Sequence, residues 1–400
     1  MTLTEAVFWT KRAGLALIVA TLLFIPIRII IMIIAQGNMA GPGTKLPFAS
    51  QRYGSLPDLS LQGLSLDESS EPSFFLETPA GEFPDITKVA QVYKLDEKQQ
   101  SLTALDEAKE LARKLKFEAE PSRIPNSNKY QWNDNFGRIL TFDVSTQNFN
   151  LNTDFQKDVY DLKSPIPDLD TAEERVISFL ESLGLYDTSY RDGFVEKRFI
   201  KFGPTGEYLI SNSQIEADLI RLDFFRSTKL LQYTEEEKAL IEAFKEGNRN
   251  ISEEDLPEEI MAEIRTQEIV KSNVSLLIRG TNFNKIGEIY ELNYNFWPIN
   301  EDETETYYVK YPAEAWDDVK TGKAFLRYLV PKGGEPFAPY TPINVSQFLI
   351  YDMSLVYLES TEYQSYLQPV YLIKGEARTL GNTGKPDLDF MFMTPAVKYY

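Results

Sequence analysis

The stretch TAEERVISFLESLGL, residues Thr171–Leu185, gives the clearest indication of the fold. Thr171 and Glu174 have the spacing of a capping box, and Gly184 provides a stop signal at the other end. Between these ends an apolar stripe at helical spacing predicts one buried helix face, made by Val176, Phe179, Leu180 and Leu183. Segments of alternating polarity follow, and we expect antiparallel strands at 195–202, 206–212 and 217–225.

The same order of helix and strands is present on both sides of this stretch. Upstream, residues 103–115 predict a helix with Thr103 and Asp106 at capping positions, and residues 138–145 predict a strand. Downstream, residues 311–325 predict a helix with Pro312 in its first turn, followed by strands at 343–359, 366–377 and 389–397. Helices that recur with antiparallel strands predict an α+β fold, in which each helix packs on an antiparallel sheet.

The N-terminal part contains an apolar run at residues 13–35, interrupted by Pro26 and Arg28. At about 1.5 Å per residue the run is long enough to cross a hydrocarbon core of about 30 Å. A secretory signal peptide has a shorter apolar region, of about 7–15 residues. We therefore expect a retained transmembrane helix, kinked at Pro26, in which Arg28 snorkels toward the outer face.

Basic residues predict the orientation of this helix. Lys11 and Arg12 border its N-terminal end, so the positive-inside rule places residues 1–12 in the cytoplasm and the remaining chain outside a cell membrane crossed once. Residues 36–72 are rich in Gly, Pro and Ser and show no sustained periodicity, which predicts a stalk. The alternative is a set of extended segments docked on the folded part, because Leu56 and Pro57 offer apolar surface.

Beyond the stalk we expect three α+β modules, over residues 73–162, 163–310 and 311–400. The second module contains an acidic segment at 234–270 that predicts a pair of amphipathic helices. Leu240, Ile241 and Phe244 share one side of this insert. Their side is a candidate surface for a protein partner, and a lid packed on its own domain is the alternative.

The composition restricts the chemistry of the protein. The 400 residues include neither cysteine nor histidine, which removes thiolate nucleophiles, disulfides, the commonest general base and the commonest transition-metal ligand. The formal net charge of −19 repels nucleic acid. P-loop, GxSxG and SxxK motifs are missing as well. We therefore expect a protein without catalytic residues, cofactor, metal or nucleic-acid partner.

Two acidic patterns have simple structural explanations. Asp168 and Asp170, like Asp387 and Asp389, have the spacing of calcium ligands, but neither pair continues into an EF-hand loop. Helix capping and loop structure explain them better. The acidic run at 300–306 predicts a solvated hairpin loop.

Aromatic residues gather in two parts of the sequence. Tyr290, Tyr294 and Phe296 recur on one predicted strand face, and a later cluster comprises Tyr351, Tyr357, Tyr366 and Tyr371. Exposed rings would stack on glycans, whereas buried rings would fill the interface between helix and sheet. Packing in the core is the favoured interpretation.

The C-terminal third resembles a known family. The segments Ala313–Ala324, Val345–Tyr357 and Tyr366–Ala377 are similar to a helix and two strands of YycH/YycI-type envelope proteins and PepSY-like modules. The resemblance implies one N-terminal span, an extracytoplasmic stack of helix-on-sheet modules, and regulation of a sensor histidine kinase. The acidic insert at 234–270 departs from that pattern. Residues 74–84 are similar to uncharacterised single-span envelope proteins of small-genome bacteria.

The leading hypothesis is a non-enzymatic, membrane-anchored extracytoplasmic protein that binds or regulates another envelope protein. Its expected partners are membrane lipid, through residues 13–35, and another envelope or membrane protein. One alternative is an envelope protein that binds or cleaves glycans of the cell wall. The second alternative is a structural scaffold of a surface or secretion assembly.

Overall fold

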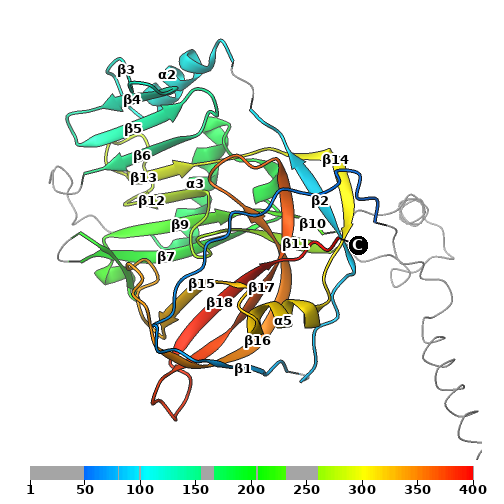
Figure 1. Ribbon diagram of the computed structural model, residues 1–400. Coiled ribbons are helices and arrows are strands. Elements are labelled where there is room, and N and C mark those ends of the chain that lie inside the picture. The colour runs from blue at the N-terminus through cyan, green and yellow to red at the C-terminus, as the bar shows by residue number, and fades with distance from the viewer. Residues whose placement is uncertain are drawn as a thin grey trace, which may run out of the picture. The chain divides into compact units, whose positions relative to one another are not determined.

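The computed structural model describes residues 49–79, 81–98, 101–154, 166–203, 206–230 and 260–399. This part of the chain is mainly β with few helices, and its strands form an antiparallel sheet and a curled mixed sheet (Figure 1). None of its helices has the length and apolar character needed to cross a membrane. The predicted transmembrane helix, with Lys11, Arg12, Pro26 and Arg28, lies outside the described residues, as do Leu240, Ile241 and Phe244.

The antiparallel sheet has nine strands, and two helices cover one of its faces. In spatial order its strands are β3 (Ser122–Arg123), β4 (Lys129–Asn133), β5 (Arg138–Asp143), β6 (Phe149–Thr153), β13 (Ile289–Tyr294), β12 (Val274–Ile278), β9 (Leu219–Phe225), β7 (Phe194–Phe202) and β8 (Tyr208–Ser211). Helices α2 (Ala104–Lys114) and α3 (Leu169–Leu183) share a single apolar core with these strands. Short 3₁₀ helices occur at η1 (Thr188–Tyr190) and η2 (Gln214–Glu216).

The mixed sheet is built around two long strands, β16 (Val345–Glu359) and β17 (Tyr366–Thr379). The first part of β16 pairs in parallel with β1 (Ser73–Leu76), and its end pairs in parallel with β11 (Met261–Thr266). The remaining strands are β2 (Val89–Leu95), β10 (Ser227–Lys229), β14 (Ile299–Tyr308), β15 (Phe325–Pro331) and β18 (Leu388–Pro395). Helix α5 (Pro312–Lys320) packs on this sheet through Ala315 and Val319.

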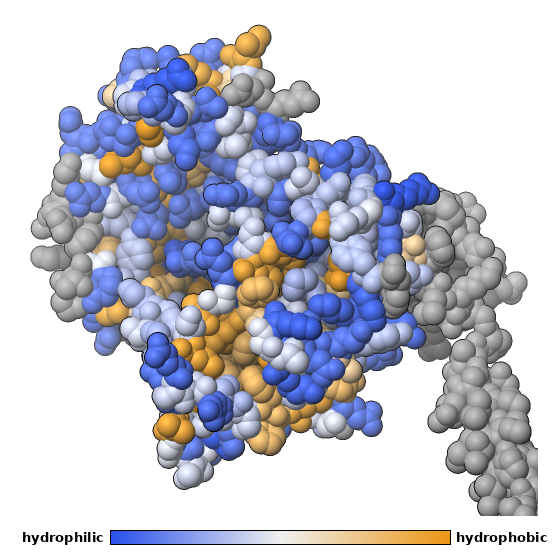
Figure 2. Space-filling model, in the orientation of Figure 1, coloured by the Kyte–Doolittle hydropathy of each residue, from blue (hydrophilic) through white to orange (hydrophobic). Residues whose placement is uncertain are grey.

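The two sheets differ in surface character as well as in topology. Figure 2 shows apolar side chains gathered over the region of the mixed sheet, whereas hydrophilic side chains dominate the visible surface of the antiparallel sheet. Partly buried Phe325 and Tyr328 of β15 and Met391 of β18 pack against an apolar cluster whose buried residues lie mainly on β16, β17 and β18.

The predicted helices at 103–115, 171–185 and 311–325 are confirmed as α2, α3 and α5. The start of α3 was predicted too late: Asp168 is the N-cap, and its carboxylate accepts from the backbone N–H of Thr171 at 2.9 Å. Thr171 therefore lies in the first turn. Gly184 ends the helix with φ 73°, as expected from its freedom in the left-handed region.

The three expected helix-and-strand units do not form three separate sheets. Both α2 and α3 pack on the one antiparallel sheet, in which β6 pairs directly with β13 across a long sequence separation. Strand pairing over such separations leaves no local signal in the sequence. The described fold is thus better summarised as two sheets with three covering helices.

Two local predictions were wrong because each segment forms a strand that pairs with another strand distant in the sequence. The C-terminal part of the expected helical insert at 234–270 is strand β11, which buries Ala262 and Ile264 beside β16. The acidic run at 300–306 is part of β14 and pairs with β2, with a register shift between Asn300 and Thr304. Short segments of this kind satisfy helical, strand and loop patterns equally well.

The described part of the expected stalk, residues 49–72, is docked on the folded chain, which was the alternative interpretation. Its backbone donates hydrogen bonds to Thr306 and Leu326, from Gln51 at 3.0 Å and from Leu64 at 2.7 Å. Leu56 and Leu61 are buried. Burying each leucine contributes about 1.5–3 kcal/mol, which offsets part of the entropy cost of ordering this segment.

Most of the aromatic residues fill the core, as predicted, whereas Tyr351 and Tyr366 are only half-buried. Tyr294 and Phe296 are buried under the helices, and Tyr357 and Tyr371 are buried in the mixed sheet. Tyr290 is buried as well but joins a cluster on the opposite face, because a register shift lies beside it between β12 and β13.

At three places where the chain passes from one sheet to the other, which we call crossings, it contacts one buried ion pair, Arg226–Glu359. Arg226 connects β9 to β10, and it also donates to the carbonyl of Trp297, in the connection from β13 to β14, at 3.1 Å. Asn273, in the connection from β11 to β12, hydrogen-bonds the Glu359 carboxylate. Both charged side chains are almost fully buried. The pair therefore holds all three crossings against the end of β16.

We expect Glu359→Gln to lower the free energy of unfolding by about 3–5 kcal/mol, because it leaves the buried Arg226 charge without its partner. Urea denaturation of the purified chain measures this change. The double variant Arg226→Met with Glu359→Leu removes both charges and should recover much of the loss. Equal destabilisation by the single and double variants would show that packing, and not the ion pair, matters at this position.

Candidate functional site

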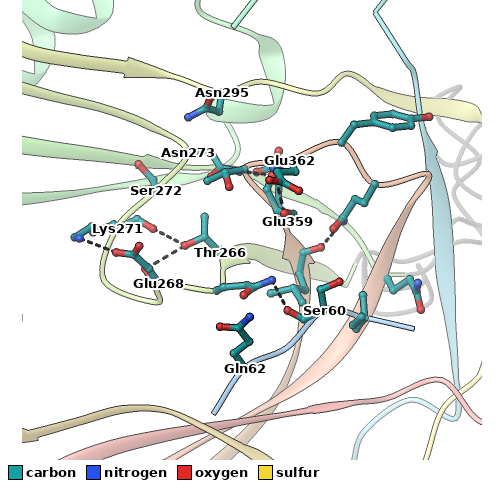
Figure 3. Close-up of a pocket in the computed structure, with 18 of the residues that line it drawn as sticks. Ser60, Gln62, Thr266, Glu268, Lys271, Ser272, Asn273, Asn295, Glu359 and Glu362 are labelled. Carbon is teal, nitrogen blue, oxygen red and sulfur yellow. Dashed lines mark hydrogen bonds and ion pairs between the residues drawn. The ribbon is translucent and has the colours of Figure 1, made fainter. Parts of the chain in front are cut away.

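A polar cleft of about 800 Å³ lies where the helix-free face of the antiparallel sheet meets the turn between β16 and β17 (Figure 3). Strand alternation explains its polarity. Tyr294 and Phe296 point into the core, so Asn293 and Asn295 point the other way and line the cleft. Arg221 on β9 and Ser275 on β12 lie on the same wall.

The opposite side is formed by a docked segment, residues 57–62, which we call the strap. Figure 3 shows Ser60 and Gln62 of the strap across from Asn273 and Asn295. Two glutamine side chains hold the strap in place: Gln368 donates to the carbonyl of Pro57 at 2.9 Å, and Gln267 donates to that of Ser60 at 2.8 Å. The side of the cleft formed by the strap is therefore held in position by side-chain amides bound to backbone carbonyls.

The charged groups of the cleft are largely neutralised within it. Arg221 makes two 2.8 Å bonds to the buried carboxylate of Asp223, and Lys271 pairs with Glu268 at 2.6 Å. Arg327 donates to the carbonyl of Gln267 from two nitrogens, at 2.9 and 2.7 Å. The interior thus presents mainly neutral hydrogen-bonding groups.

Several lining side chains remain available for a ligand. Among the described residues, the side chains of Gln62, Asn295 and Thr361 make no hydrogen bond to the protein, and the carboxylates of Asp58 and Glu362 make no ion pair. An amide side chain both donates and accepts hydrogen bonds. The cleft is therefore suited to a neutral ligand that is rich in donors and acceptors. Across the described ranges, no three carboxylates gather in a way that would hold a metal ion.

Lys98 is the amine with the most perturbed environment in the described chain. Its Nζ lies 5.7 Å from the ring centroids of Tyr294 and Phe296, 6.0 Å from that of Trp297, and 3.1 Å from Oδ1 of Asn148. Burial lowers the pKa of Lys98 to about 8, and nearby Arg226 acts in the same direction. We interpret it as a structural amine, because its contacts are to core rings and one amide.

No motif in the sequence identifies the cleft as a site, although one signal for it is present. Asn293 and Asn295 alternate with the aromatic residues that were singled out, and period-2 alternation assigns them to the opposite face. Asp168 is confirmed as a helix cap, and Asp387 is a loop acid that accepts from Thr379 at 3.0 Å. The strap and the turn at 360–365 carry no pattern that would bring them together.

The comparisons with known proteins add little to this description. No family model matches the chain, and no curated protein matches it. Among solved structures, the chain is similar to an uncharacterized protein from Eubacterium rectale, with 12% sequence identity and a TM-score of 0.35. The match covers 78% of this chain and 84% of that one. A likeness of this size carries no argument about function.

We expect Lys98→Met to raise the free energy of unfolding at pH 7, because it removes a partly buried charge. One pKa unit corresponds to about 1.4 kcal/mol, so the gain is up to about 3 kcal/mol. In the wild-type chain the unfolded amine keeps its proton up to about pH 10.5, whereas the folded amine loses it near pH 8. Stability therefore rises with pH across this window. The variant should lack this rise in denaturation curves, whereas Lys385→Met, at an exposed lysine, should retain it.

Proposed function

We propose that this protein is a non-enzymatic binding protein, anchored in a cell membrane through residues 13–35, that uses the polar cleft to bind an extended segment of another envelope protein. The observation that supports this most is the set of free amide and hydroxyl side chains facing a nearly neutral cleft. Main-chain N–H and C=O groups of an extended segment match such side chains. A volume of about 800 Å³ is within the range of ligand sites in proteins.

The class of partner follows from the family resemblance. The segments similar to YycH/YycI-type regulators, Ala313–Ala324, Val345–Tyr357 and Tyr366–Ala377, correspond to α5, β16 and β17. The β16–β17 turn lies directly at the cleft. A membrane sensor kinase, or another protein of the envelope, is therefore the partner that we propose. Within this proposal, α5, β16 and β17 together form a PepSY-like module.

Glycan binding is the second candidate, and a specific ring favours it. Tyr363 lines the cleft with 37% of its surface exposed, beside the amides of Asn295 and Gln364. Sugars are bound by such combinations of an aromatic face and amide groups. The buried Tyr294 is not available for stacking, so a test of glycan binding belongs at Tyr363.

We expect a photo-crosslinking residue at Thr361, in the exposed β16–β17 turn, to capture one membrane or envelope protein in intact cells. The same residue at Lys385, in the turn between β17 and β18, is the matched control and should not capture it. Asn295→Ala should reduce the crosslink at Thr361 about tenfold, since one or two hydrogen bonds are lost. Asn133→Ala, at an exposed amide of β4 outside the cleft, should leave it unchanged.

Other outcomes would favour the other hypotheses. Equal capture from positions 361 and 385 would contradict the cleft as the binding site. Saturable binding of a cell-wall oligosaccharide, lost in Tyr363→Ala with the fold intact, would favour the glycan function. Ordered assemblies of the purified chain in electron micrographs would favour a scaffold.

A further inference from the structure

A second hollow, of about 460 Å³, lies on the antiparallel sheet's helical side and shares no lining residue with the cleft. It is formed by the end of α2, one side of α3 and the loop that follows β12. Its lining residues are Lys114, Lys116, Arg175, Ser178, Phe179, Ser182, Leu183, Thr281, Asn282, Phe283 and Asn284. We refer to it as the basic hollow.

The charge of this hollow is opposite to that of the chain. Acidic residues outnumber basic ones by 60 to 41 in the sequence, yet the hollow is lined by three cations and no carboxylate. Among the described residues, Lys114, Lys116 and Arg175 make no ion pair. Three like charges around one hollow repel each other unless an anion sits between them.

Capping of α2 does not explain these lysines. Basic residues at a helix C-terminus commonly bond to the last carbonyls, but here buried Arg138 fulfils that role. Its guanidinium donates to the carbonyl of Leu115 at 3.0 Å and to that of Lys116 at 3.1 Å, and Asp134 neutralises it at 2.6 Å. The ammonium groups of Lys114 and Lys116 are therefore free for another partner.

The backbone at Lys116 supports the same conclusion. Both α2 and α3 end in a Schellman motif: the N–H of Phe117 bonds to Ala112 at 2.8 Å, and that of Leu185 bonds to Leu180 at 2.9 Å. The left-handed residue is Gly184 in α3, with φ 73°, but Lys116 in α2, with φ 67°. Glycine is the favourable residue at this position, so lysine is kept there against a backbone cost.

The floor and rim add apolar contact and hydrogen bonding. The rings of Phe179 and Phe283 lie 4.6 Å apart and form a partly buried floor. Thr281, Asn282 and Asn284 place hydroxyl and amide groups at the rim. A carboxylate has two oxygens for three cations, whereas a phosphate monoester has three free oxygens and an organic part that packs on the rings.

We infer that the basic hollow binds a phosphate monoester, with Lys114, Lys116 and Arg175 around the phosphate and the organic part on Phe179 and Phe283. The site is separate from the polar cleft and does not depend on the function proposed for it. A soluble sugar or polyol phosphate and the headgroup of phosphatidic acid carry the same phosphate monoester. The experiment distinguishes these two sources.

The test is isothermal titration calorimetry on the full chain with three probes: glycerol 3-phosphate, short-chain phosphatidic acid and short-chain phosphatidylcholine. We expect saturable binding of at least one of the first two, weakened by salt through screening. Binding of glycerol 3-phosphate assigns a soluble source, and binding of phosphatidic acid alone assigns a headgroup. Absence of binding by both, or equal binding of phosphatidylcholine, would overturn the inference.

Variants locate the site. Lys114→Gln with Lys116→Gln, and separately Arg175→Gln, should each weaken binding about tenfold or more, because each removes charge-assisted hydrogen bonds. The control double variant Lys323→Gln with Lys385→Gln removes the same charge elsewhere and should bind as wild type does. Loss of binding in the control would refute the site.

Lys116→Gly separates binding from folding. Because glycine suits the left-handed position, we expect the Tm to stay unchanged or to rise while phosphate binding weakens. Unchanged binding together with a higher Tm would exclude Lys116 from the site. This outcome would leave no explanation for a lysine in that conformation, and it would count against the inference.

Discussion

The ion pair between Arg226 and Glu359 is the constraint on which the arrangement of the two sheets depends. Each sheet has its own apolar core, so burial alone would permit them to pack at many angles. The chain crosses between them three times near this pair, and a buried charge accepts only a narrow range of geometries. Arg265 reinforces the junction: it pairs with Glu196 at 3.1 Å and lies 4.6 and 4.7 Å from the rings of Phe194 and Phe225. These directional interactions thus fix the relative orientation of the two sheets, which hydrophobic burial alone does not determine.

The polar cleft is a consequence of this junction and of strand alternation. Helices α2 and α3 cover one face of the antiparallel sheet, so the opposite face must be polar or covered by something else. Around β8 it is covered by an apolar cluster that includes Ile200 and Leu219, whereas near the crossings it carries arginine, serine and asparagine. The neutral character of the cleft results from local pairing, in which each cationic side chain already binds a carboxylate or a carbonyl.

The sequence predicts local structure well here and long-range pairing poorly. Helices α2, α3 and α5 have a 3.6-residue apolar period, stop signals and first-turn residues within a single segment, and all three were found. The partners of β1 and β2 lie more than 200 residues away in the sequence, and the parallel partner of β11 lies beyond several intervening strands. No local pattern encodes these pairings. The same applies to the sites. The asparagines of the cleft could be assigned to a face from alternation, but the meeting of the strap with the β16–β17 turn could not. The basic hollow unites α2, α3 and a loop through tertiary packing alone.

The docked segment at residues 49–76 has a consequence for the order of events during synthesis. Ser50 bonds to Thr306, and Ser73 is in register with Gln347, so these contacts link residues more than 250 positions apart. A ribosome makes the whole antiparallel sheet, from β3 to β13, before it makes Thr306, Leu326 and β16, which bond to the backbone of this segment. Domains fold as their chains emerge, and contacts of long sequence separation form late. The earliest part of the described chain to be translated is therefore among the last to reach its final position.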